Sequence, residues 1–363
     1  MEPVTHFLTG AVLSRAFFSR RNALATVTMS LAAEAPDIDM VAYFGGTAVG
    51  FAHHRGFTHT VIGMPVVAAL VIAFLYVAER LYRKWRPGTD RPASETAPQK
   101  PRWGKLFGLA LIAGYSHLLL DFTNNYGIRP LWPFSDLWYS WDIVFIIEPL
   151  ILLVLIGGLA LPALFGLINS EIGARSRGPR GRGGAITALV LLVLIWGFRD
   201  YQHRRAIAAM QARTYQDQTA TRVGAFPYHT NPFKWYGIAE TDEFYQTMIV
   251  DSSIPDVDPN GRALTYYKSE ETDVTKTAKE TYLGRAYFGW AGYPTTEVER
   301  REYPGGFEYV VHFRDLRFAY PDRRRTPLTA YVLLDSNLRV EEEAFSSRNP
   351  VTDRLESPGS GTD

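Results

Sequence analysis

The stretch VIGMPVVAALVIAFLYVA, residues 61–78, decides the fold. It contains no charged side chain and is followed directly by Glu79 and Arg80. An apolar run of this length can cross the hydrocarbon core of a bilayer as an α-helix. The stretch therefore predicts a membrane-spanning helix and excludes an ordinary soluble globule.

Further apolar segments lie on both sides of this run. Residues 143–168 are long enough to span, with Glu148 interrupting the run and Pro149 bending it. Residues 106–120 and 183–198 are long enough to cross the membrane only if neighbouring residues lengthen the helix. Residues 4–18 and 22–33 are shorter and could form a hairpin buried against the other helices. The sequence thus predicts a helical, polytopic membrane domain of four to six segments over residues 1–199.

The composition limits the possible partners and cofactors. Residues 1–199 contain 18 Lys and Arg against 12 Asp and Glu, and residues 200–363 contain 20 against 25, giving net charges of +6 and −5. Neither half is strongly basic, which argues against nucleic acid as a partner. The chain has no cysteine. A metal site would therefore need histidine and carboxylate ligands.

The distribution of basic residues predicts an orientation in the membrane. Alternate connections hold 15 of them, whereas the opposite connections hold only Arg55 and Arg129. Basic connections face the cytoplasm, so residues 34–60 and 121–142 and the C-terminal part are expected on the outer face of a bacterial inner membrane. The 15 residues are Arg15, Arg20, Arg21, Arg80, Arg83, Lys84, Arg86, Arg91, Lys100, Arg102, Lys105, Arg175, Arg177, Arg180 and Arg182.

The character of the chain changes after Phe198. Residues 200–219 read as a polar linker helix. Residues 307–313, 328–334 and 338–342 are rich in strand-forming residues and are separated by Pro, Gly and Asp. We therefore expect a small, mainly antiparallel β domain over residues 220–345, on the extracytoplasmic side, and a flexible tail over residues 346–363.

Histidines and carboxylates gather where the predicted segments reach the outer face. Five of the eight histidines lie in the membrane half. The orientation was derived from Lys and Arg alone, so this convergence is independent of it. The residues that we expect to meet there are His6, Asp37, Asp39, His53, His54, His59, His117 and Asp121.

His117 and Asp121 stand four residues apart, so a helix would present both side chains on one face. They could hold a cation together, or they could form a hydrogen-bonded pair between helices. Asp37 and Asp39 follow Pro36, which disfavours helix at the preceding residue and predicts a turn. A turn or a helix cap is the simpler explanation for that pair.

The block His54-Arg55-Gly56-Phe57-Thr58-His59 is more unusual. Residues five apart on a regular helix point about 140° apart, so both histidines could converge only if Gly56 bends the backbone. Thr58 could cap the following helix. Arg55 could stabilise an oxyanion or a phosphate, or form a salt bridge with Asp37 or Asp39.

These motifs, together with Thr5-His6, Thr123 and Gly127, resemble the YdjM-like family of bacterial inner-membrane proteins, described as predicted metal-dependent hydrolases. The likeness covers roughly residues 1–170. A remoter similarity is to the zinc-dependent phospholipase C and P1 nuclease group. That similarity implies ligands at Asp37 or Asp39, at His54 or His59, and at His117 and Asp121. The chain departs from that group because it has no later His-x-x-x-Glu pair.

The leading hypothesis is a membrane-bound metal-dependent hydrolase that acts on a phosphoester or lipid-linked substrate at the outer face. The metal would be zinc, with manganese as the alternative, and Arg55 would steady developing negative charge. Asp37 or Asp39 would act as general base. The expected ligands are His6, Asp39, His54, His59, His117 and Asp121.

The alternative is a non-catalytic scaffold. Its metal or polar site would be structural, and its β domain would bind an envelope partner. A transporter would place ionisable residues on both sides of the membrane midplane, whereas here they gather on one side.

Overall fold

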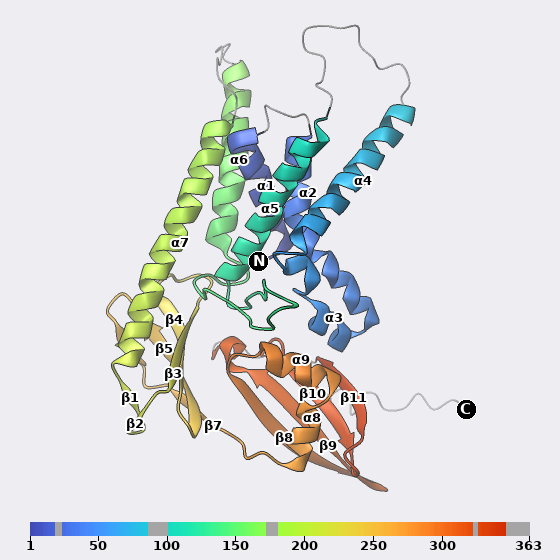
Figure 1. Cartoon of the computed structure of the whole chain (residues 1–363). Coiled ribbons are helices and arrows are strands. Elements are labelled where there is room, and N and C mark those ends of the chain that lie inside the picture. Colours follow the sequence, from blue (N-terminus) through green and yellow to red (C-terminus); the bar gives the residue numbers. More distant parts are fainter. Residues whose placement is uncertain (19–23, 86–100, 172–180, 322–325, 346–363) are drawn as a thin grey trace, which may run out of the picture. The chain divides into compact units, whose positions relative to one another are not determined.

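The computed structural model describes residues 1–18, 24–85, 101–171, 181–321 and 326–345 (Figure 1). The predicted tail lies outside the described residues, and so do the basic residues Arg20, Arg21, Arg86, Arg91, Lys100, Arg175, Arg177 and Arg180. The chain divides into two compact units, each described by itself. The first comprises residues 1–39, 55–202 and 227–232, and the second comprises residues 40–54, 203–226 and 233 onward.

The first unit is helical. Three of its helices are long and apolar enough to cross a membrane: α4 (Met64–Trp85), α5 (Trp103–Thr123) and α7 (Arg182–Gln211). Helix α6 (Pro149–Glu171) is apolar over Pro149–Phe165. The short helices α1 (Pro3–Leu13), continued by a π-helical turn at Ser14–Phe18, and α2 (Ala25–Glu34) form the predicted N-terminal hairpin. The predicted helical membrane half is thus confirmed.

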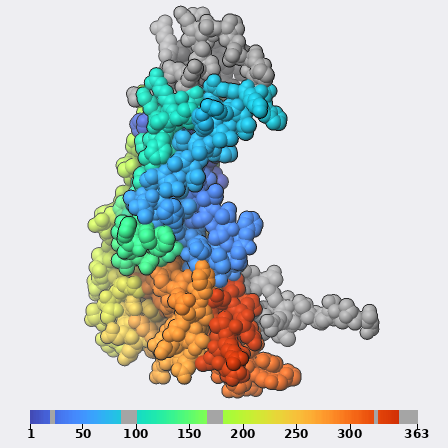
Figure 2. All heavy atoms as spheres, turned by 45° about the vertical axis from the view of Figure 1, so that its right-hand side comes forward, coloured from blue at the N-terminus to red at the C-terminus, as the bar shows by residue number. Residues whose placement is uncertain are grey.

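Helix α4 exposes an apolar face. Leu70, Phe74 and Val77 are all more than half exposed. Figure 2 shows this helix, blue to cyan, on the face of the first unit. An apolar face of this kind suits contact with lipid rather than with water.

Pro149 begins a helix instead of bending one. The predicted segment 143–168 loses its first six residues, because α6 starts at Pro149. Proline is well suited to the first helical position, where its missing N–H costs no hydrogen bond. The carbonyl of Glu148 accepts from Leu152 N at 3.2 Å, so Glu148 stands just before the helix.

Small residues bring α1, α2 and α5 close together. A Cβ atom on Gly10 of α1 would lie 2.3 Å from the carbonyl oxygen of Met29 on α2, so only glycine fits there. Ala33 on α2 and Ala113 on α5 are buried. Close approach of backbones through small residues is typical of membrane helix packing. Here it brings the backbone of α2 within reach of side chains on α5.

The second unit is mainly antiparallel β-structure, which confirms the predicted fold class. Helix α7 continues without a break to Gln211, beyond the predicted end of its apolar segment, and a hairpin of β1 (Thr214–Tyr215) and β2 (Gln218–Thr219) follows. One sheet has the order β3-β4-β5-β6 with β7 on β5, and another has the order β11-β10-β9-β8. The first comprises β3 (Arg222–Pro227), β4 (Lys234–Glu240), β5 (Phe244–Asp251), β6 (Asp256–Val257) and β7 (Leu264–Tyr267). The second comprises β8 (Pro294–Tyr303), β9 (Gly306–Asp315), β10 (Ala330–Asp335) and β11 (Val340–Phe345), and helices α8 (Asp273–Lys279) and α9 (Tyr282–Trp290) precede it in the chain.

Residues 40–54 pack with the second unit, although the sequence analysis placed them in the membrane domain. They contain the end of a 3-10 helix (Ala35–Gly45) and helix α3 (Thr47–His53). The ring of Phe51 lies 5.2 Å from Trp290 and 4.6 Å from Phe345. The hydroxyl oxygen of Thr47 accepts from Phe345 N at 3.2 Å. Aromatic burial therefore anchors this segment to the second unit.

Candidate metal centre

Two carboxylates and two imidazoles from separate parts of the first unit converge on one point. Asp37 lies in the 3-10 helix after α2, His59 in a 3-10 turn (Phe57–His59) before α4, and His117 and Asp121 on α5. One ligand atom from each lies within 4.8 Å of the others, and all except Asp37 are fully buried.

The spacing of the four atoms fits a tetrahedral ion. The Nε2 atoms of His59 and His117 are 3.0 Å apart. Asp37 Oδ1 lies 3.3 Å from His59 Nε2 and 3.7 Å from His117 Nε2, and Asp121 Oδ2 lies 3.6 and 3.5 Å from the same two atoms. Four ligands at zinc bond lengths of about 2.0–2.1 Å stand about 3.3–3.4 Å from one another. The donor set therefore fits a divalent metal.

Each of the two histidine rings has a hydrogen-bond acceptor at its Nδ1 atom, which places a proton on that nitrogen. His117 Nδ1 donates to the carbonyl oxygen of Ala33 at 2.7 Å, an acceptor made available by the close packing of α2 and α5. His59 Nδ1 lies 3.1 Å from Asp39 Oδ2. With Nδ1 protonated in each neutral ring, both Nε2 atoms carry lone pairs. Two lone pairs facing each other at 3.0 Å repel unless a metal cation or a shared proton lies between them.

Asp39 lies behind His59 rather than at the centre. Its Oδ2 atom also accepts from the backbone N–H of Arg55 at 2.7 Å and from the Thr58 hydroxyl at 3.3 Å. A carboxylate in this position fixes the orientation of a metal-binding histidine and raises its basicity. The sequence analysis listed Asp39, and not Asp37, among the expected ligands. In the structure Asp37 is one of the four converging residues, and Asp39 lies behind His59 instead.

The bend in the His54–His59 block falls at both Arg55 and Gly56. Arg55 has a φ of 53°, in the left-handed region, and Gly56 has a φ of −82° and a ψ of −134°, outside the helical and extended regions. Of the two histidines in this block, only His59 is one of the four converging residues. His54 ends α3, its ring stands 6.5 Å from that of Tyr43, and it is not one of the four converging residues. Thr58 bonds to Asp39, and the hydroxyl that accepts from Gly63 N before α4 belongs to Thr60.

Arg55 is buried, and its side chain pairs with Asp121 rather than with Asp37 or Asp39. Its guanidinium donates to Asp121 Oδ1 at 2.8 Å and to the carbonyl of Gly127 at 2.6 Å, and it lies 4.7 Å over the ring of Tyr126. Burial lowers its pKa to about 10, so it stays charged at neutral pH. Asp121 Oδ2, the atom that faces the histidines, has no hydrogen-bond partner among the described residues.

His6 lies beside the four residues. Its ring stacks on that of His117 with centroids 3.7 Å apart, and its Nε2 is 3.4 Å from Asp121 Oδ1. Within the described part of the chain, neither ring nitrogen has a hydrogen-bond partner. The predicted ligand therefore borders the centre but does not supply one of its four atoms.

The pKa values of two nearby carboxyl groups, Asp37 in the centre and Glu34 three residues before it, are shifted in opposite directions. Burial alone would raise the pKa of Asp37, but the hydrogen bond with His59 and the nearby charges of His117, His59 and the N-terminus together outweigh burial and hold the pKa at about 2. Burial and the nearby charge of Asp37 raise the pKa of Glu34 to about 8. Sequence reasoning missed Glu34, because its only signal was its place three residues before Asp37.

The chain has relatives among known proteins. A family model described as YdjM inner membrane protein matches residues 1–206. The chain is 24% identical over 310 residues to the uncharacterized protein YfhP of Bacillus subtilis (strain 168), covering 85% of this chain and 80% of the relative. No solved structure matches significantly, and no comparison shows the remoter similarity to the phospholipase C and P1 nuclease group. With more than half of its length matched, and with the membrane helices that the description requires, the chain belongs to the YdjM inner membrane protein family.

Proposed function

We propose that the protein is a membrane-bound metal-dependent hydrolase. One observation carries the proposal: the Nε2 atoms of His59 and His117 face each other at 3.0 Å while both Nδ1 atoms are directed at hydrogen-bond acceptors. A metal cation between them would relieve the repulsion of the two lone pairs. Two nitrogen and two oxygen donors suit zinc, with manganese as the alternative.

A divalent metal bound there would supply Lewis-acid activation of a water molecule for hydrolysis. Asp39 positions His59, and Arg55 holds Asp121 so that Oδ2 faces the histidines. Because Arg55 is bound to Asp121 and Gly127, we assign it a positioning role in place of the expected oxyanion contact. Asp37 is one of the four converging residues and Asp39 faces His59 Nδ1, so the general base is assigned to His6, whose ring borders the centre.

We propose a phosphoester or lipid-linked substrate. The support is the buried centre on α5, a candidate membrane helix, and its carboxylates, which suit a hard cation that binds phosphate oxygens. The excess of basic residues in alternate connections supports placing this centre, and the C-terminal unit, at the outer face of the inner membrane.

The test is metal content by elemental mass spectrometry of the full chain purified in detergent. We expect one equivalent of zinc or manganese in the wild type, and less than a tenth of it in the His117→Ala and Asp121→Ala variants. His53→Ala, which removes an exposed histidine, is the matched control and should keep the metal. Hydrolysis of phosphodiester and phospholipid substrates should fall together with metal content. A wild type that stays metal-free after reconstitution contradicts the proposal.

A structural metal site is the second candidate, favoured by the number of protein ligands. Four protein ligands without an open position are typical of structural zinc sites. Removal of the metal by a chelator separates the two. A catalytic centre loses turnover, keeps its fold and regains turnover when metal is restored, whereas a structural centre loses the melting transition of the helical unit.

A further inference from the structure

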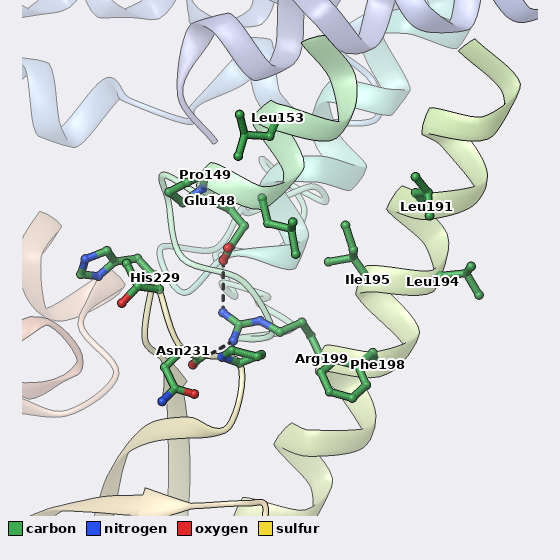
Figure 3. Close-up of a pocket in the computed structure, with 13 residues that line it drawn as sticks. Glu148, Pro149, Leu153, Leu191, Leu194, Ile195, Phe198, Arg199, His229 and Asn231 are labelled. Atoms are coloured by element: carbon green, nitrogen blue, oxygen red, sulfur yellow. Dashed lines mark hydrogen bonds and ion pairs between the residues drawn. The ribbon is translucent and has the colours of Figure 1, made fainter. Parts of the chain in front are cut away.

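A second site lies in the first unit, in a groove that is lined by α6, α7 and residues 229–232. The groove has a volume of about 500 Å³, within the usual range for small-molecule sites. It shares no residue with the metal centre. Figure 3 shows its lining.

The two ends of the groove differ in chemistry. Leu153 on α6 and Leu191 and Leu194 on α7 form an apolar wall, and all three are exposed. The other end carries Glu148 and Arg199 (Figure 3). Because α7 is a candidate membrane helix, hydrocarbon surrounds the apolar wall in the membrane. The groove therefore suits amphiphilic ligands rather than water-soluble ones.

The polar end holds one charge of each sign. Arg199 donates to Glu148 Oε2 at 3.1 Å and to the carbonyl of Tyr228 at 3.0 Å, and both charged side chains are buried. Their charges offset each other, and the groove lining contains no other Asp, Glu, Lys or Arg. Arg199 also donates to the carbonyl of Asn231 at 3.4 Å, and a guanidinium has five N–H donors in all.

We propose that this groove binds one zwitterionic aminophospholipid, with its acyl chain along the leucines, its phosphate at Arg199 and its ammonium group at Glu148. A net-neutral end with fixed opposite charges complements a zwitterionic head group better than an anionic one, because an anionic lipid would leave Glu148 as a repelling charge. An ammonium also donates hydrogen bonds to the carboxylate, which a choline group cannot do.

The test is native mass spectrometry of the full chain in detergent with equimolar phosphatidylethanolamine and phosphatidylglycerol. We expect one bound phosphatidylethanolamine, preferred about tenfold, the discrimination that a charge-assisted hydrogen bond supplies. Equal binding of the two lipids would overturn the proposal.

Two variants on α7 locate the binding. Leu194→Trp fills the groove and should lower phosphatidylethanolamine binding about tenfold. Val193→Trp is the matched control, because Val193 and Leu194 are both 61% exposed but only Leu194 lines the groove. Loss of lipid in both variants or in neither would show that binding lies elsewhere and would overturn the proposal.

Glu148→Gln tests the charge argument. It leaves Arg199 as the only charge in the groove, so the preference should reverse to phosphatidylglycerol. An unchanged preference would contradict the assigned role of Glu148. All three variants should keep their metal, so this proposal and the hydrolase proposal can fail separately.

Discussion

The backbone N–H of Arg55 donates to Oδ2 of Asp39 at 2.7 Å, and this hydrogen bond joins the two ends of residues 40–54. The same carboxylate oxygen faces His59 Nδ1. The Asp39 side chain therefore holds together the two ends of residues 40–54, which pack with the second unit. It also orients His59 of the metal centre.

Asp39→Asn should weaken metal binding about 10- to 100-fold, the usual effect of changing the partner of a metal-binding histidine. The amide is uncharged and is a weaker acceptor for His59 Nδ1. Competition titration with a chromogenic chelator measures the affinity. Asp136→Asn, at an exposed aspartate of the first unit, should leave it unchanged. Equal affinities of the wild type and Asp39→Asn would contradict the orienting role.

Gly10→Ala should destabilise the helical unit by about 1–3 kcal/mol, because overpacking forces the backbones apart. The new Cβ would meet the carbonyl oxygen of Met29 at 2.3 Å. Gly108→Ala on α5 is the control, since its Cβ meets nothing within 4 Å. That substitution should stabilise by up to about 1 kcal/mol through helix propensity. Unfolding monitored by circular dichroism in detergent should shift in opposite directions for the two variants.

Phe51→Ala should destabilise the C-terminal unit by about 3–5 kcal/mol, the cost of deleting a buried aromatic ring. Phe51 lies among Tyr287, Trp290 and Phe345. Hydrogen exchange should accelerate in α9 and β11. Phe44→Ala, in the same segment, is the control because Phe44 is 95% exposed. Unaltered exchange in α9 would show that the segment does not pack there in solution.

Glu34 gives the metal-free protein a pH dependence. Its pKa is raised from 4.5 to about 8, so the folded state binds the proton more tightly than the unfolded state. Stability from this group is fully present below about pH 4.5 and is lost as the pH rises to about 8. The melting temperature of Glu34→Gln should therefore fall less between pH 5 and 8 than that of the wild type. Glu79→Gln, on α4, serves as the control, and parallel curves for all three proteins would refute the assignment.

The sequence determined the features that depend on local pattern. The charge-free run at residues 61–78 needs a helix to satisfy its backbone in lipid, and α4 occupies most of it. The four-residue spacing of His117 and Asp121 places both on one face of any helix, so their pairing followed from periodicity alone. Strand-forming runs separated by turn residues likewise predicted the antiparallel β-structure.

Only the tertiary structure decided between residues that look equivalent in the chain. Asp37 and Asp39 differ in role because Asp39 lies against His59 Nδ1 and the Arg55 backbone, contacts that depend on a left-handed residue at position 55. His59 enters the centre and His54 does not, for the same reason. Pairing of Arg55 with Asp121 and packing of residues 40–54 with the C-terminal unit join positions far apart in sequence. No local pattern encodes such contacts, because they arise from burial and close packing between elements.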